Sequence, residues 1–136
     1  MLICHDVRYP ELYREYRKLG VDCLFNSFHN ACQKGPGLLS VIMRATLQAR
    51  AATNFMWISA PNSSAYYSLW SSVFVQPDGI IAGSLVRNRA GIMVNTVDTS
   101  RAFKDASAAF RDDAMAGKLH SGTVVRDIRS RNRRGH

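Results

Sequence analysis

Cysteine is scarce in this sequence, and the three present are Cys4, Cys23 and Cys32. Their spacing matches no zinc-binding pattern, and an odd number argues against a disulfide framework. We therefore predict a reduced, cytoplasmic protein. Long apolar runs are also missing, so no membrane-spanning segment is expected. A charged leader followed by an apolar stretch is not found at the start, which argues against a signal peptide.

Acidic residues are few as well, since 18 Lys and Arg face 10 Asp and Glu, giving a formal net charge of +8. About half of the excess comes from residues 120–136, which hold five arginines and one aspartate. Such a short basic end is more typical of a solvated tail or a subunit contact than of a nucleic-acid reader. Nucleic-acid binding is therefore not favoured, and we predict one domain over residues 1–116 followed by an extended basic tail over 117–136.

The first part of the chain has the pattern of a parallel β-α-β unit. Residues 2–4 look like the end of a buried strand, and Pro10 can open a helix because it has no N–H to lose. An apolar stripe of Leu12, Tyr16 and Leu19 predicts a helix over residues 10–19, which Gly20 ends. A strand is expected at residues 21–28, parallel to the first.

The remaining pattern predicts a mixed α/β sheet with helices on one face. Good helix formers fill residues 38–53, and an apolar strand follows at residues 55–60. Short connections then favour an antiparallel meander. We expect its strands at residues 72–76, 80–85 and 91–97, and a last helix at residues 102–116.

Cys4 is the main candidate for chemistry, because it lies where a strand ends and a helix is about to begin. A turn of this kind can expose a nucleophile, although a small cysteine at a strand end is also a common core residue. The string CHDVRYPEL over residues 4–12 favours the nucleophile. It resembles the nucleophile motif of the nitrilase superfamily of carbon–nitrogen hydrolases, whose seven specified positions it matches.

The resemblance continues to about Asp98. Arg50-Ala51-Ala52-Thr53-Asn54 is similar to a family motif that usually has Glu at the position of Thr53. Asn62, just after the expected strand at residues 55–60, resembles the residue that ends this strand in the family. The strand that begins at Ser72 also resembles a family strand, but Trp70 stands before it where the family usually has Gly. The resemblance implies an α-β-β-α sandwich, present here in part and without its N-terminal strands. It also implies dimerisation through helices and C-terminal tails, so a homo-oligomer is expected.

The implied reaction is hydrolysis of a nonpeptide amide, nitrile or carbamoyl compound, with no metal or organic cofactor. In that family a cysteine forms a thioester intermediate, a glutamate is the general base, a lysine stabilises the tetrahedral intermediate, and a second glutamate assists. Residue by residue, Cys4 takes the nucleophile's place, and the motif residues Asp6, Arg8 and Glu11 are expected to support the turn. The glutamates and the lysine of the family lie before the cysteine, where this sequence has only residues 1–3.

We therefore expect the chain alone to be inactive or nearly so, because a cysteine without a base and an oxyanion stabiliser loses most of its power. The alternative is a non-enzymatic nitrilase-like dimerisation or binding module. His29, Asn62 and Trp70 are candidate pocket residues, and Tyr66 and Tyr67 could line a substrate mouth or a dimer face. The substrate itself stays open among amide, nitrile and carbamoyl compounds.

Overall fold

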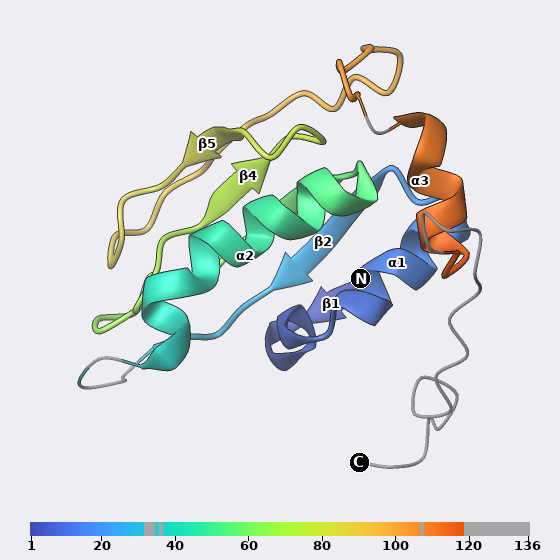
Figure 1. Cartoon of the computed structure of the whole chain (residues 1–136). Helices are drawn as coiled ribbons and strands as arrows, with labels where there is room; N and C mark the ends of the chain where they lie inside the picture. Colours follow the sequence, from blue (N-terminus) through green and yellow to red (C-terminus); the bar gives the residue numbers. More distant parts are fainter. Residues whose placement is uncertain (32–34, 36, 107, 119–136) are drawn as a thin grey trace. The chain divides into compact units, whose positions relative to one another are not determined.

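The protein forms a mixed five-stranded sheet in the computed structural model, which describes residues 1–31, 35, 37–106 and 108–118. The strand order is β1-β2-β3-β4-β5, with the first three strands parallel and the last two antiparallel to their neighbours. Figure 1 shows α1 and α2 lying along one face of this sheet. The elements are β1 (Leu2–Ile3), η1 (Cys4–Arg8), α1 (Pro10–Lys18), β2 (Cys23–Ser27), α2 (Leu38–Asn54), β3 (Trp57–Ala60), β4 (Val73–Val75), β5 (Ile81–Ser84) and α3 (Ala108–Met115).

The helices α1 and α2 lie where the sequence predicts them. Pro10 opens α1, but the buried residue of this helix is Tyr13, and Leu19 lies beyond its end with 79% of its surface exposed. The predicted stripe is therefore wrong at Leu19, while Leu12 and Tyr16 pack against the core as expected. In α2 the residues Met43, Leu47 and Ala51 are spaced by four and form the buried stripe.

The core lies between α2 and the sheet. Leu24 pairs with Ile58, and Ile58 pairs with Val75, so these three side chains share one sheet face. All three are buried together with the apolar stripe of α2. The opposite face carries Phe25, which is 55% exposed. The sheet therefore has one covered face and one partly open face, as a partial sandwich requires.

The strand predicted at residues 91–97 does not form. This segment runs back along β5 (Figure 1) but has no strand pairing, and Ile92 and Val94 are 91% and 90% exposed. The segment instead approaches β5 closely at Gly83, where the side chains of Met93 and Asn95 lie against the glycine. A Cβ atom added at Gly83 would lie 2.6 Å from Met93 Sδ and 2.8 Å from Asn95 Oδ1, so a larger residue there would require these side chains to move. This segment therefore contacts the sheet through the Met93 and Asn95 side chains and not through a backbone ladder.

A second unit of the chain begins at Lys104. Its helix α3 covers 108–115, so the helix predicted over residues 102–116 is present but shorter. Within this unit Arg111 forms an ion pair with Asp105. The predicted tail at residues 117–136 lies almost entirely outside the described residues, and the predicted domain boundary at residue 116 stays a prediction.

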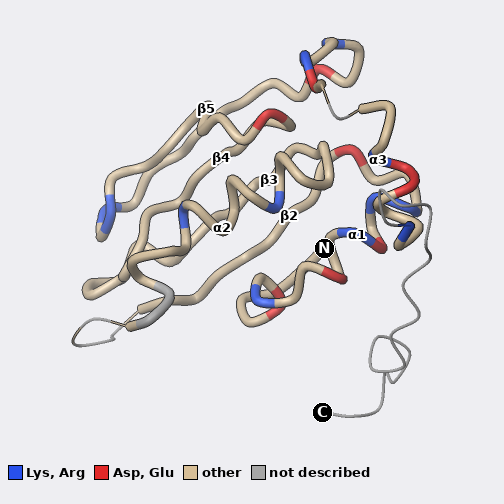
Figure 2. Tube along the Cα trace, viewed as in Figure 1, with Lys and Arg blue, Asp and Glu red and all other residues tan. Residues whose placement is uncertain are grey.

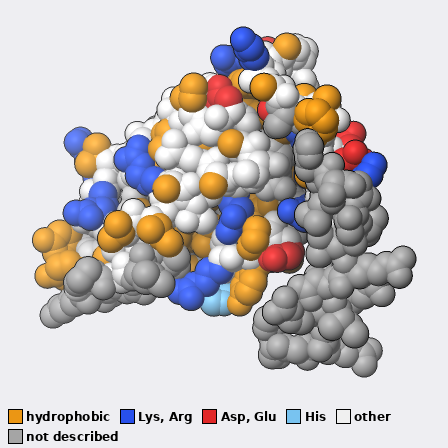
Figure 3. Space-filling model, in the orientation of Figure 1, with side chains coloured by type: hydrophobic (Ala, Val, Ile, Leu, Met, Phe, Trp, Pro, Cys, Tyr) orange, Lys and Arg blue, Asp and Glu red, His pale blue; other side chains and the backbone are white. Residues whose placement is uncertain are grey.

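Charge is unevenly divided between the two helices of the first unit. Figure 2 shows both signs on α1 and only basic residues on α2, which has Arg44 and Arg50. Basic side chains are dispersed among apolar ones on the face seen in Figure 3. Within the described part of the chain, no helix has the length and apolar character needed to cross a bilayer.

Tyr13 and Asn26 are buried between α1, β2 and α2, next to the half-buried Arg50. Asn26 Nδ2 donates a hydrogen bond to the Tyr13 hydroxyl at 2.6 Å, and the Arg50 guanidinium lies 5.8 Å from the centre of the Tyr13 ring. Burial raises the pKa of Tyr13 from its usual 10 to about 12, and the Asn26 hydrogen bond and the Arg50 charge offset only part of that shift.

This raised pKa predicts a loss of stability in alkali. The unfolded chain releases the Tyr13 proton near pH 10 while the folded chain keeps it to about pH 12, so unfolding is increasingly favoured as pH rises between these values. The expected loss is about 2–3 kcal/mol by pH 12. Urea unfolding of the wild type and of Tyr13→Phe at pH 8 to 11.5 would test it. The difference between the two should shrink as pH rises, and a constant difference would contradict the prediction.

Candidate active site

Cys4 begins a tight 3-10 turn, η1, directly at the end of β1. Its φ of 44° places it in the left-handed region, which is uncommon for a residue other than glycine. The Asp6 carboxylate closes the turn, because its Oδ2 accepts a hydrogen bond from the Ile3 N–H at 2.8 Å. The next turn is fastened by the Tyr9 N–H, which donates to the Asp6 carbonyl at 3.1 Å. A strained cysteine on a turn fixed at both ends is the arrangement that presents a nucleophile.

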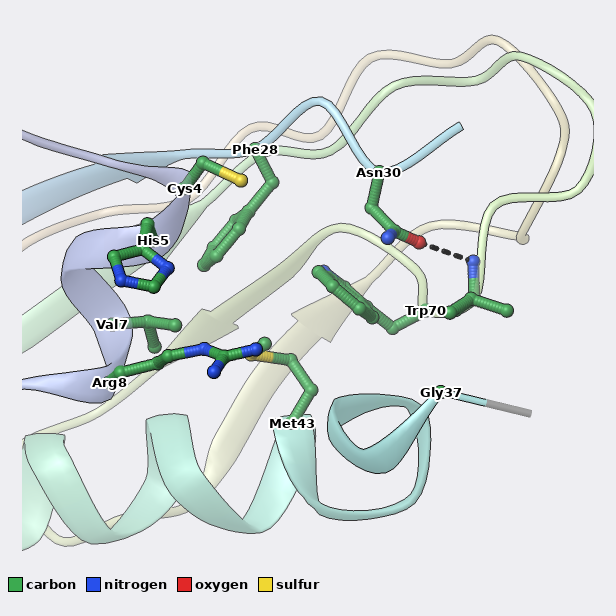
Figure 4. Close-up of a pocket in the computed structure, with 10 residues that line it drawn as sticks. Cys4, His5, Val7, Arg8, Phe28, Asn30, Gly37, Met43 and Trp70 are labelled. Carbon is green, nitrogen blue, oxygen red and sulfur yellow. Dashed lines mark hydrogen bonds between the residues drawn. The ribbon is translucent and has the colours of Figure 1, made fainter. Parts of the chain in front are cut away.

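A cavity of about 200 Å³ opens beside Cys4. Figure 4 shows Cys4 and the Phe28 ring on one side of it and the Trp70 ring on the other, with the Arg8 side chain extending toward Met43. Phe28 and Trp70 meet edge to face, with ring centres 5.6 Å apart. The polar residues that line the cavity are Cys4, His5, Arg8, Asn30 and Trp70.

His5 lines the cavity but is engaged elsewhere. Its Nε2 lies 3.0 Å from the Tyr9 hydroxyl, and the Cys4 sulfur has no hydrogen bond to any described residue. The two residues do not form a dyad in this structure, although they follow each other in a 3-10 turn rather than in a strand. Among the described residues that line the cavity there is no carboxylate and no lysine, so a proton acceptor of that kind is missing from this wall.

The far wall of the cavity depends on two asparagines, one in the loop after β2 and one in the loop after β3. Asn30 Oδ1 accepts a hydrogen bond from the Leu69 N–H at 2.7 Å, and the Asn30 N–H donates to Asn62 Oδ1 at 2.9 Å. Asn62 Nδ2 in turn donates to the Trp70 carbonyl at 2.8 Å. Asn30 was not predicted as a site residue from the sequence. The sequence feature that could have indicated it is its position beside His29, just after the end of β2.

The residues proposed from the sequence are only partly brought together. Trp70 lines the Cys4 cavity, and Asn62 holds Trp70 in place while lining a neighbouring cavity. His29 is exposed and is not part of the Cys4 cavity wall. Glu11 lies exposed in the first turn of α1.

Side chains that could hold a metal do not gather in the described part of the chain. No group of three or more His, Cys, Asp or Glu residues there has the required proximity. The described cysteines Cys4 and Cys23 are both free thiols, and burial raises the pKa of Cys23. The chemistry that the described site offers is therefore that of a thiol beside a guanidinium and an aromatic wall.

Comparison with known proteins agrees with this reading. The family model for carbon-nitrogen hydrolase matches residues 1–105. Among solved structures, the NitN amidase of Nesterenkonia sp. AN1 is 27% identical, with a TM-score of 0.50 over 62% of this chain and 32% of that chain. A variant of that amidase carrying acrylamide on its active-site cysteine gives 27% identity and a TM-score of 0.50, over 62% of this chain and 33% of that chain.

A third similar structure is Nit3 of Saccharomyces cerevisiae, a member of branch 10 of the nitrilase superfamily. It is 24% identical, with a TM-score of 0.50 over 61% of this chain and 31% of that chain, and it supports the fold alone. The chain thus spans about a third of the length of these structures. No curated protein sequence gives a significant match. Since the family model covers most of the residues and the fold agrees, this chain belongs to the carbon–nitrogen hydrolase family.

Proposed function

We propose that this chain carries the nucleophile of a hydrolase acting on a nonpeptide amide, nitrile or carbamoyl compound. The observation that carries the proposal is Cys4 at a left-handed residue of a fixed turn, next to a cavity. In the proposed reaction the Cys4 sulfur attacks the carbonyl or nitrile carbon. An amide or carbamoyl compound loses its amine, which leaves with the thiol proton, and a thioester-type intermediate remains. A nitrile first gives a thioimidate, which water converts to the thioester with release of ammonia. Water then hydrolyses the thioester to the acid and the free thiol. Attack requires a reduced thiol, in keeping with the cytoplasmic setting expected from the sequence.

We further propose that this chain alone turns over substrate very slowly. No carboxylate or lysine is present in the described cavity wall, so nothing there can take the thiol proton in the manner that the family resemblance implies. The Arg8 guanidinium lines the cavity and can attract negative charge, but it carries only N–H donors and has no atom that accepts the thiol proton. The assignment of Cys4 as the nucleophile is supported by the similar Nesterenkonia amidase, a variant of which adds acrylamide at its active-site cysteine.

Competitive alkylation tests the nucleophile. The chain is treated with limiting acrylamide at pH 7.5, and each cysteine-containing peptide is measured by mass spectrometry. We expect the Cys4 peptide to be modified at least about tenfold faster than the Cys23 peptide, because burial raises the pKa of Cys23 and lowers its thiolate fraction. Cys4→Ser should remove the fast phase. Equal rates for the two peptides would refute Cys4 as an activated nucleophile.

Ammonia release tests the second part of the proposal. With a panel of small amides, the wild type should release no more ammonia than Cys4→Ser. Release that depends on Cys4 would show that this chain is active by itself and would overturn the expected inactivity. It would leave the assignment of the nucleophile intact.

A second candidate function is a non-enzymatic binding module. It is favoured by the small volume of the Cys4 cavity, which is about 200 Å³. Pockets that bind drug-sized ligands usually have volumes of at least about 300 Å³. It is also favoured by the exposed apolar side chains of Ile3 and Phe25 on adjacent strands, which are 59% and 55% exposed. On this basis we propose a homo-oligomer, and sizing chromatography giving a clean monomer would count against it.

A further inference from the structure

A second cavity, of about 330 Å³, lies beyond the end of β3 and is not used by the chemistry proposed for Cys4. Its walls come from the loop after β3 and from the chain that follows β5. Trp70 belongs to the walls of both cavities, which makes them neighbours. Its volume reaches the lower end of the range found for small-molecule sites.

Two arginines give this cavity its charge. Arg87 and Arg89 both line it, and no aspartate or glutamate does among the described residues. Neither guanidinium has an ion pair or a hydrogen bond to another described residue. Two positive charges that lack a counter-charge in a polar hollow attract anions.

The rest of the polar lining consists largely of hydroxyl groups. Five serines line the cavity, and those of Ser59 and Ser64 have no side-chain hydrogen bond to a described residue. A serine hydroxyl can donate one hydrogen bond and accept others, so it can turn its donor toward an anion. Arginine adds a planar pair of N–H donors, which matches the spacing of two oxygens on a carboxylate or phosphate.

The walls are held in place before any ligand binds. Asn88 lies between the two arginines in a left-handed conformation, with a φ of 60°, and its Oδ1 accepts a hydrogen bond from the Ser68 N–H at 2.8 Å. On the other side, the Asn62 N–H donates to Ser72 Oγ at 2.9 Å. The first bond joins the two loops that form the cavity, and the second joins the two ends of the loop after β3. A site fixed in this way loses little conformational entropy on binding.

We propose that this second cavity binds the oxyanion group of a small molecule, either a carboxylate or a phosphate. Arg87 and Arg89 supply the charge, and the free hydroxyls of Ser59 and Ser64 supply further donors. The site is independent of the Cys4 thiol, so its occupancy does not require the chain to be a competent hydrolase.

Titration followed by NMR tests the proposal on the full chain. Inorganic phosphate and sodium acetate are added separately to ¹⁵N-labelled protein, with sodium chloride at equal ionic strength as the reference. We expect saturable shifts of backbone amides at residues 59–72 and 84–95, with phosphate or with acetate, and the better binder identifies the kind of group. Cys4→Ser should bind like the wild type.

Matched variants assign the binding to the arginines. Arg87→Gln and Arg89→Gln should each raise the dissociation constant about tenfold, which corresponds to one charge-assisted hydrogen bond. Arg44→Gln removes the same charge from the exposed face of α2, outside the cavity, and should leave the dissociation constant of the anion unchanged. Shifts that grow linearly without saturation, or equal weakening by all three variants, would overturn the proposal.

Discussion

Trp70→Ala is expected to lower the free energy of unfolding by about 3–5 kcal/mol, because it empties a large buried site between two loops. Only 7% of the Trp70 surface is exposed, and its ring packs edge-on against Phe28. Trp70→Phe should cost much less. The indole Nε1 is buried without a hydrogen-bond partner among the described residues, so phenylalanine removes an unsatisfied donor together with part of the ring.

The same substitution should change access to Cys4. Since Trp70 belongs to the walls of both cavities, alanine at this position should join them. The ratio of the rate with a bulky maleimide to the rate with acrylamide at Cys4 should then be higher in Trp70→Ala than in the wild type. The rates of both reagents with Cys23 should change little. Urea unfolding measures the stability, and mass spectrometry measures the two alkylation rates.

Tyr66→Ala is the matched control for this prediction. Tyr66 is an aromatic residue in the same loop but is 67% exposed, so its loss should change stability by less than about 0.5 kcal/mol. If Trp70→Ala were as mild as this control, the aromatic wall would not contribute to the fold. If stability fell but the maleimide gained nothing, Trp70 would not limit access to the thiol.

The parallel β-α-β unit and the position of Cys4 could be predicted because they depend on local pattern. Pro10 and Gly20 mark the ends of one helix, and the apolar runs on either side give the strands. The family motif over residues 4–12 then places a cysteine at the strand end, and the structure has η1 there. Local sequence carries this information because each feature involves residues within one or two turns of each other.

The cavity wall could not be predicted, because it depends on contacts between distant residues. Asn30 and Leu69 are 39 positions apart, and no periodicity links them. The strand expected at residues 91–97 failed for a related reason. A short apolar run over residues 92–94 fits a strand, but a strand also needs a hydrogen-bonded partner. This segment contacts β5 through the side chains of Met93 and Asn95 instead.

Asn62→Ala is the prediction that bears most directly on how this wall is built. The Asn62 side chain accepts hydrogen bonds from the N–H groups of Asn30 and Ser63, each at 2.9 Å, and donates one to the Trp70 carbonyl at 2.8 Å. Alanine leaves three backbone groups without these partners. Because an unsatisfied buried group costs about 1–3 kcal/mol and water can reach part of this site, a loss of about 2–4 kcal/mol is expected.

Ser64→Ala is the control for Asn62→Ala, since Ser64 lies in the same loop and its hydroxyl has no hydrogen-bond partner among the described residues. It should leave the urea midpoint nearly unchanged. Asn62→Ala should lower the midpoint without changing the urea dependence of the unfolding free energy, because the folded core is retained. It should also reduce the preference of acrylamide for Cys4 over Cys23. Loss of stability with an unchanged preference would mean that Asn62 holds the loops but does not shape the cavity around the nucleophile.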